Sequence, residues 1–280
     1  MRIALTIAGS DSGGGAGIQA DLKTFHQFGV FGTSAITAVT AQNTVAVLAW
    51  QALPAALVQR QIDALADDLP PAAVKSGMLG SAEIVATVAA ALVRHGLPNY
   101  VLDPVMVATS GDVLVADTTG AQSDSVGAQH AVPLLIARRL VTLATIVTPN
   151  LDEAAILVGD DVRTPAQMER AGRALVAMGA RAALVKGGHL TGTEEIVDVL
   201  VQNGATRRFT HPRIDTTSTH GTGCTLSAGI AAGLALGRPL EQAVTDALDF
   251  VHRAIAAAPG LGRGGHGPLN HFVPGPPRPP

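Results

Sequence analysis

The sequence contains few aromatic residues and a single cysteine. Aromatic residues make up 3 % of the 280 positions, whereas hydrophobic residues as a whole make up 47 %, so the core must be built mainly from aliphatic side chains. Cys224 cannot form an internal disulfide by itself, which favours a reducing compartment, the cytoplasm. The formal net charge is −3 and no block of like charges is present, which argues against nucleic acid or a membrane surface as the main partner.

Long hydrophobic runs are also missing. The longest apolar region, CTLSAGIAAGLALG at 224–237, is shorter than a membrane span and rich in small residues, so a buried helix is the better interpretation. The N-terminal stretch MRIALTIAGSDSGG has a short apolar run that stops at Gly9. That run is typical of a first strand rather than of a secretory signal.

Short apolar runs alternate with segments of helical periodicity. The runs lack strict alternation, which is typical of parallel strands covered on both faces. Helical spacing is found after the first run and again late in the chain, from Val244 to Ile255, and a hairpin is expected at 195–211 around Asn203 and Gly204. The expected strands are 3–8, 34–40, 72–78, 100–103, 144–148 and 182–186. The sequence therefore predicts an α/β sandwich with a mostly parallel sheet.

A single domain is expected over residues 1–272. Within it, the stretch ADTTGAQSDSVGAQH at 116–130 is small, polar and aperiodic, which indicates a loop or insertion. Residues 273–280 are rich in proline and are expected to form a disordered tail.

Side chains suited to binding phosphate, metal or amide groups follow six expected strands. Because ligands bind beyond the carboxyl ends of the strands in open parallel sheets, these residues predict a binding site there, although any single one could be a turn residue. They are Ser10 and Asp11, Gln42 and Asn43, Lys75 and Met78, Asp103, Asn150, and Lys186.

The first loop, GSDSGGGAG at 9–17, matches neither common nucleotide-binding glycine motif. No lysine follows Gly14, and Ile18 stands where a third spaced glycine is needed. What remains is a glycine-rich turn that lets a ligand approach the backbone closely. Asp21 projects from the apolar side of the helix that follows, so its carboxylate needs either a ligand or a structural partner.

Three further candidates have structural alternatives. Asn150 and Glu153 in TPNLDEA also fit a helix N-cap with an acid three residues on. Lys186, before two glycines, either faces a polyphosphate or is a surface lysine with a buried stem. The nine histidines show no metal-ligand spacing such as H-E-x-x-H.

The segment THGTGCTLSAGI at 219–230 places Cys224 at the start of an expected helix. Unpaired backbone N–H groups there point toward whatever anion lies in front of them. A thiol at such a position is expected to have a lowered pKa and raised reactivity. The alternative is a small buried side chain, the usual state of a free cysteine.

These segments together resemble the ribokinase-like superfamily and, within it, the hydroxymethylpyrimidine/phosphomethylpyrimidine kinases of thiamine biosynthesis. The shared segments occur in the family's order from residue 8 to residue 272, and several are long and specific. They are AGSDSGGGAGIQAD, TAVTAQNT, KSGMLGS, LDPVMVATSG, TPNLDEA, VKGGH, HGTGCTLSA and GHGPLNHF. One departure is that the chain between LDPVMVATSG and TPNLDEA is longer than expected for the family.

The resemblance implies a three-layer α/β/α sandwich, a homodimer and a magnesium-assisted kinase. The expected reaction is ATP-dependent phosphorylation of 4-amino-5-hydroxymethyl-2-methylpyrimidine, followed by phosphorylation of its monophosphate to the diphosphate. By similarity, Gln42 binds the aminopyrimidine edge, since an amide both donates and accepts. Asp21, Gly9 with its loop, and Met78 complete that pocket.

On the nucleotide side, the resemblance implies that Lys186, Asn150 and Asp103 meet the phosphates and that Glu153 with Asp103 organises magnesium, directly or through water. Cys224 stands where related sugar kinases carry an aspartate base. The backbone amides of Gly221, Thr222, Gly223 and Cys224 are expected to form an anion hole for the transferred phosphate.

Two other functions remain open at this point. A pyridoxine or pyridoxal kinase is the nearest alternative, because its substrate also carries a hydroxymethyl group on a six-membered heterocycle. A non-catalytic vitamin-binding or regulatory protein on the same fold is an alternative of a different class.

Overall fold

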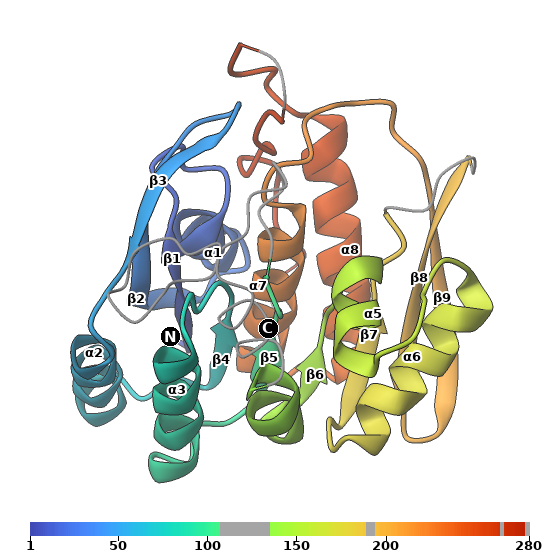
Figure 1. Cartoon of the computed structure of the whole chain (residues 1–280). Coiled ribbons are helices and arrows are strands. Elements are labelled where there is room, and N and C mark those ends of the chain that lie inside the picture. Colours follow the sequence, from blue (N-terminus) through green and yellow to red (C-terminus); the bar gives the residue numbers. More distant parts are fainter. Residues whose placement is uncertain (107–134, 189–193, 264–265, 278–280) are drawn as a thin grey trace.

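The computed structural model describes residues 1–106, 135–188, 194–263 and 266–277 (Figure 1). The expected loop or insertion at 116–130 lies outside the described residues. Within these ranges, none of the helices has the length and apolarity needed to traverse a lipid bilayer.

The described strands form one nine-stranded sheet in the order β3-β2-β1-β4-β5-β6-β7-β8-β9. The six strands from β2 to β7 along this order pair in parallel, whereas β3, β8 and β9 pair antiparallel to their neighbours. The strands are β1 (Ile3–Ser10), β2 (Phe31–Gln42), β3 (Val47–Ala52), β4 (Ala73–Ser76), β5 (Tyr100–Leu102), β6 (Ile146–Val147), β7 (Ala182–Val185), β8 (Glu195–Gln202) and β9 (Ala205–Pro212). All six expected strands and the hairpin are therefore confirmed, while the edge strand β3 was not predicted.

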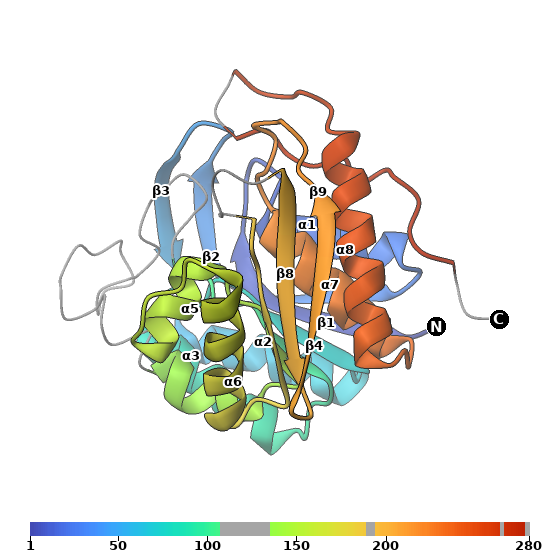
Figure 2. The same cartoon turned by 90° about the vertical axis from the view of Figure 1, so that its right-hand side faces the viewer.

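Helices cover both faces of the sheet, which gives the expected three layers (Figures 1 and 2). One face carries α1 (Gly17–Gln27), α7 (Thr222–Ala235) and α8 (Leu240–Ala256). The other carries α2 (Ala55–Asp68), α3 (Ala82–Arg94), α5 (Leu151–Val158) and α6 (Pro165–Ala177), with short helical turns at Ile136–Leu140 and Val141–Leu143.

Neighbouring residues of each central strand point into opposite cores. Ala4 packs with the α1, α7 and α8 layer, whereas Leu5 packs with the α2 and α3 layer. Val101 and Leu102 divide in the same way. Because both faces of these strands are buried, the strands need apolar residues at every position, which explains their continuous apolar runs.

The expected buried helix is α7, whose residues from Thr225 to Ala235 are all buried. Glycine allows its close contact with α8, since a Cβ at Gly233 would lie 2.7 Å from the Cβ of Ala243. This packing fixes the start of α7 at the carboxyl edge of the sheet, next to β4 and β5.

Residues 273–277 follow α8 without helix or strand. Arg253 and Arg238 donate hydrogen bonds to the carbonyl oxygens of Pro274 and Pro277. Residues 278–280 lie outside the described ranges, so disorder of the tail stays a prediction.

Candidate active site

A cavity of about 710 Å³ opens at the carboxyl ends of the parallel strands. It collects nearly all the site residues expected from the sequence, although they come from segments far apart in the chain. Those lining it are Gly9, Gln42, Met78, Asp103, Asn150, Glu153, Lys186, Gly221, Thr222, Gly223 and Cys224. The rule that ligands bind at this edge of a parallel sheet therefore located the cavity correctly.

One end of the cavity is built around the ammonium group of Lys186. Its Nζ lies 3.1 Å from Oδ1 of Asp103 and 3.8 Å from Oε2 of Glu153. Burial would lower the pKa of Lys186, but the two carboxylates raise it above its ordinary value. Lys186 is therefore a fixed positive charge in the cavity wall and not a surface lysine.

Glu153 serves both the helix and the cavity. It forms a capping box with Asn150, in which each side chain accepts a hydrogen bond from the other residue's backbone N–H, at 2.9 and 2.8 Å. Burial raises the pKa of Glu153 to about 7, while Lys186 opposes this rise and Asp103 adds to it. The cap and the site function are thus compatible, because both residues also line the cavity.

The start of α7 lies directly beside this charged cluster. A Cβ at Gly223 would lie 3.1 Å from Nζ of Lys186, so any larger residue would press on the ammonium group and displace it by a few tenths of an ångström. The N–H groups of a first helical turn have no intrahelical acceptor. That of Thr222 donates to the carbonyl of Thr219 at 3.3 Å, so the donors in question are those of Gly223 and Cys224. The cavity end that holds Lys186 therefore presents a cation and free backbone donors together, as an anion requires.

The thiol of Cys224 lines the cavity, but the prediction that its pKa is lowered is wrong. Burial raises its pKa to about 11, and the positive charge of Lys75 only partly offsets burial and the negative charges of Asp21 and Asp103. The position at a helix start is as expected, yet the loss of solvent around the sulfur outweighs it. The thiol is protonated at neutral pH.

Asp21 lies beneath the cavity instead of lining it. Its carboxylate is completely buried, accepts a hydrogen bond from Thr6 at 2.6 Å and pairs with Nζ of Lys75 at 2.9 Å. The carboxylate of Asp21 holds the pKa of Lys75 above its ordinary value despite full burial. The structure thus supplies the partner that Asp21 requires, and it is Lys75, not Asp21, that reaches the cavity.

The opposite end of the cavity is formed by the glycine-rich loop and the end of β2. Ser12 joins the two, since its hydroxyl donates to the carbonyl of Gln42 and accepts from the N–H of Gln42, both at 2.7 Å. Met78 packs on the loop, because a Cβ at Gly9 would lie 3.1 Å from its Sδ. This end is less charged than the Lys186 end and suits a flat, apolar ring with a polar edge.

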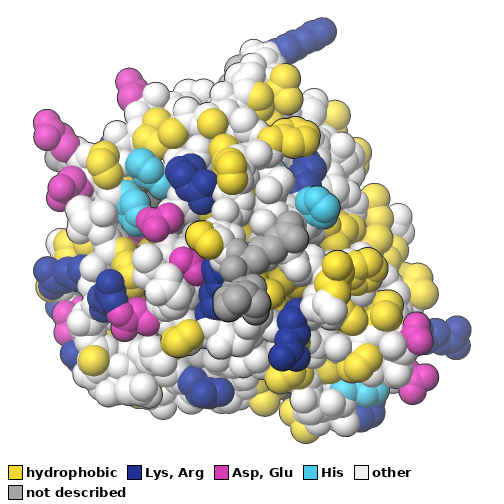
Figure 3. Space-filling view, turned by 180° about the vertical axis from the view of Figure 1, so that it is seen from behind, with side chains coloured by type: hydrophobic (Ala, Val, Ile, Leu, Met, Phe, Trp, Pro, Cys, Tyr) yellow, Lys and Arg dark blue, Asp and Glu magenta, His cyan; other side chains and the backbone are white. Residues whose placement is uncertain are grey.

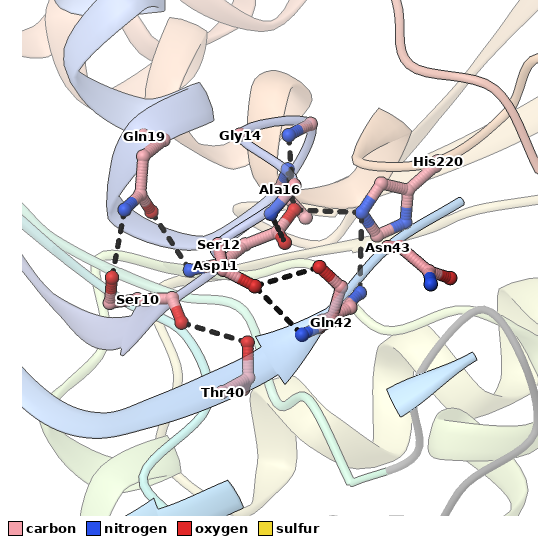
Figure 4. Close-up of polar contacts among 12 residues, drawn as sticks. Ser10, Asp11, Ser12, Gly14, Ala16, Gln19, Thr40, Gln42, Asn43 and His220 are labelled. Carbon is pink, nitrogen blue, oxygen red and sulfur yellow. Dashed lines mark hydrogen bonds and ion pairs between the residues drawn. The ribbon is translucent and has the colours of Figure 1, made fainter. Parts of the chain in front are cut away.

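The sequence placed Asp11 among the candidate binding residues but did not connect it with His220, and the structure joins the two (Figure 4). Nε2 of His220 lies 2.9 Å from Oδ2 of Asp11 and 3.3 Å from the Nε2 atom of Gln42. The two residues are 209 positions apart, so no local pattern could have revealed the contact.

No group of three or more His, Cys, Asp or Glu side chains within the described ranges is arranged to hold a metal ion alone. Asp103 and Glu153 nevertheless provide carboxylate oxygens around one ammonium group. Magnesium binds through one or two carboxylates and takes its other ligands from water and phosphate oxygens. The two residues fit that donor set.

Comparison with known proteins gives a consistent result. A family model described as phosphomethylpyrimidine kinase matches residues 11–270. A hydroxymethylpyrimidine/phosphomethylpyrimidine kinase of Rhizobium meliloti is 50 % identical over 272 residues, covering 96 % of this chain and 97 % of the relative. One from Bacillus subtilis is 44 % identical over 270 residues, covering 96 % of this chain and 94 % of the relative.

Solved structures agree. Phosphomethylpyrimidine kinase from Clostridium difficile 630 is similar with a TM-score of 0.77 at 38 % identity, covering 91 % of this chain and 100 % of that one. The ADP complex of Bacillus subtilis pyridoxal kinase is similar with a TM-score of 0.85 at 34 % identity, covering 97 % of both chains.

The raised pKa of Cys224 can be tested directly, because this is the only cysteine in the chain. Alkylation by iodoacetamide follows the thiolate fraction. We expect the rate to rise about tenfold per pH unit from pH 7 to pH 10 without a plateau. The urea-unfolded chain is the control, with its plateau setting in near the ordinary thiol pKa of about 8.5. A plateau in the folded protein below pH 9 would contradict the burial argument.

Proposed function

The chain belongs to the phosphomethylpyrimidine kinase family, and from its cavity we infer an ATP-dependent kinase that phosphorylates 4-amino-5-hydroxymethyl-2-methylpyrimidine and then its monophosphate. The resemblance, the kinase activity and the ribokinase-like fold expected from the sequence are all confirmed by the family and its structures. A non-catalytic function has no support, since the relatives are named as kinases. The observation that supports the site assignment is that one cavity has the Lys186, Asp103 and Glu153 cluster at one end and the Gln42 amide at the other.

The Lys186 end is the proposed phosphate site. Phosphoryl transfer requires mainly positioning of the groups and stabilisation of charge on the transferred oxygens. Lys186 supplies the cation, and the N–H groups of Gly223 and Cys224 in the first turn of α7 supply donors. Asn150 lies at the same end and completes the proposed contacts with ATP.

We propose that Asp103 and Glu153 would hold magnesium together with the ATP phosphates, directly or through water. When bound, this cation neutralises charge on the phosphate oxygens. The cluster of Asp103, Glu153 and Lys186 attracts a cation, because two carboxylates near one ammonium group have a net negative charge once Glu153 is ionised. With a pKa of about 7, Glu153 is ionised above neutral pH.

Gln42, Gly9 and Met78 form the proposed pyrimidine site at the other end. The amide of Gln42 pairs with the aminopyrimidine edge, and Met78 packs on the ring. Asp21 contributes indirectly, by holding Lys75 at the cavity wall.

Cys224 stands at the proposed transfer point. In the first phosphorylation the hydroxymethyl oxygen forms a bond to the γ-phosphorus of ATP as the bond to the leaving ADP oxygen breaks, and the hydroxyl proton passes late to an oxygen of the transferred phosphoryl group. A largely dissociative transfer needs orientation of the hydroxyl more than its early deprotonation. We therefore assign Cys224, whose thiol is protonated, to positioning that hydroxyl.

A coupled ADP-release assay tests this function. With ATP and Mg²⁺, we expect release with hydroxymethylpyrimidine and with its monophosphate, and far slower release with pyridoxal. Several structural neighbours are pyridoxal kinases, so release with pyridoxal alone would contradict the assignment and favour the vitamin B6 alternative.

The same assay with Cys224→Ala tests the proposed role of the thiol. Loss of the positioning group is expected to lower kcat about 100-fold, with the Kd for ADP unchanged. An unaltered kcat would remove Cys224 from the mechanism.

We further propose that the protein acts in the cytoplasm as a homodimer, with a second copy covering the exposed face of β2 and β3. Val39 on β2, Leu48 on β3 and Val45 in the turn between them are 49, 72 and 60 % exposed, and Figure 3 shows hydrophobic side chains gathered on that side. Ala41 and Ala49, which pair across the two strands, are also exposed. Since this face carries no charge, it can meet its own copy around a two-fold axis without repulsion.

Sedimentation velocity checks the dimer. The wild-type chain is expected to sediment at twice the monomer mass, and a Val39→Asp, Leu48→Asp variant at the monomer mass, because two buried charges would be left without partners. Val93→Asp, at an exposed position on α3, is the control. A variant that remains dimeric would place the interface elsewhere.

A further inference from the structure

The glycine-rich loop closes around the carboxylate of Asp11, which is 3 % exposed (Figure 4). This carboxylate accepts hydrogen bonds from the N–H groups of Gly13, Gly15 and Ala16 at 2.8, 3.0 and 2.8 Å. Burial alone would raise the pKa of Asp11, but the hydrogen bonds from His220 and the backbone lower it below its ordinary value. Asp11 is therefore ionised and can only accept hydrogen bonds.

The protonation of His220 follows from this. Its Nε2 is 2.9 Å from Oδ2 of Asp11, and an ionised carboxylate has no hydrogen to give. Nε2 must therefore carry the hydrogen and donate it. The ring cannot turn away, because it is 7 % exposed and seated against Gly15, where a Cβ would lie 2.6 Å from its Cδ2.

The same Nε2 faces the amide of Gln42 at 3.3 Å. If the NH₂ group of Gln42 faced an Nε2 that carries a hydrogen, two donors would meet without an acceptor. A half turn of the amide removes this conflict, since its Oε1 then shares the one Nε2 hydrogen with Oδ2 of Asp11 in a three-centre hydrogen bond, Asp11 at 2.9 Å being the nearer acceptor. Amide oxygen and nitrogen are assigned by such hydrogen bonds, so Oε1 is the atom beside His220.

We propose that His220, held by Asp11, is the positioning residue that fixes which way round the Gln42 amide meets the substrate, and so selects a 4-amino over a 4-oxo pyrimidine. The inference rests on the proposed function, in which Gln42 binds the pyrimidine. A 4-aminopyrimidine edge presents a donor beside a ring-nitrogen acceptor, whereas the 4-oxo form presents an acceptor beside a ring N–H. A fixed amide matches one of these edges, and an amide that turns freely matches both.

The test measures kcat/KM by ADP release for 4-amino-5-hydroxymethyl-2-methylpyrimidine and for its 4-oxo counterpart. The wild type is expected to prefer the amino form by about 100-fold or more, because the mismatched edge leaves buried polar groups unpaired. In His220→Phe, which keeps a ring in place but cannot donate, the preference is expected to fall at least about tenfold, mainly through KM.

Two further variants keep the test decisive if that protein folds poorly. His220→Gln places an N–H near the former Nε2 and is expected to retain the preference, whereas the shorter side chain of His220→Asn is expected to lose it. The Kd for ADP, which binds at the other end, should stay the same in all three variants.

A preference unchanged in both His220→Phe and His220→Asn, while Gln42→Ala abolishes it, would overturn the role of His220 and leave the proposed function intact. Gln42→Ala with an unchanged KM for the amino substrate would instead show that the proposed pyrimidine site is wrong, and the role of His220 would fail with it.

Discussion

The site depends on a close approach of two backbone segments, at Gly15 and Gly221. Gly221 has a φ of +85°, and a Cβ there would lie 1.9 Å from the carbonyl oxygen of Gly15, so no other residue fits. This contact joins the loop after β1 to the turn before α7. It therefore holds His220 against the glycine loop and the first turn of α7 at the edge of the sheet. The distance between the two ends of the cavity is fixed as a result.

Lys75 and Lys186, the two lysines of the cavity wall, differ in the charges that surround them. Lys75 is paired with one carboxylate, that of Asp21, and their charges cancel. Lys186 faces two carboxylates, so that end of the cavity changes its net charge as Glu153 titrates near a pKa of about 7. The first pair is a permanent part of the floor, whereas the second cluster can adapt to a bound cation and to phosphate charge. This difference supports our proposal that the nucleotide binds at the Lys186 end.

Much of this arrangement could be predicted from the sequence, and the failures have physical causes. Buried parallel strands need continuous apolar runs, and their carboxyl ends meet at one edge, so the sheet and the cavity followed from local patterns. The edge strand β3 was not predicted because its residues are nearly all apolar, so no alternation separates the buried Trp50 and Ala52 from the exposed Leu48 and Ala49. The pKa of Cys224 has the wrong expected direction because burial of the sulfur depends on segments distant in the chain. The pairs Asp21–Lys75 and Asp11–His220 lie 54 and 209 positions apart, so only the fold could reveal them.

The central claim is that one cavity holds a phosphate end and a pyrimidine end, and calorimetric titration of two variants tests it most directly. Lys186→Met is expected to weaken ADP binding by about 10-fold or more, since it removes hydrogen bonds to a charged group, with pyrimidine binding unchanged. Gln42→Ala is expected to weaken pyrimidine binding by about tenfold with ADP binding unchanged. Loss of both ligands in each variant, or the opposite pattern, would contradict the account.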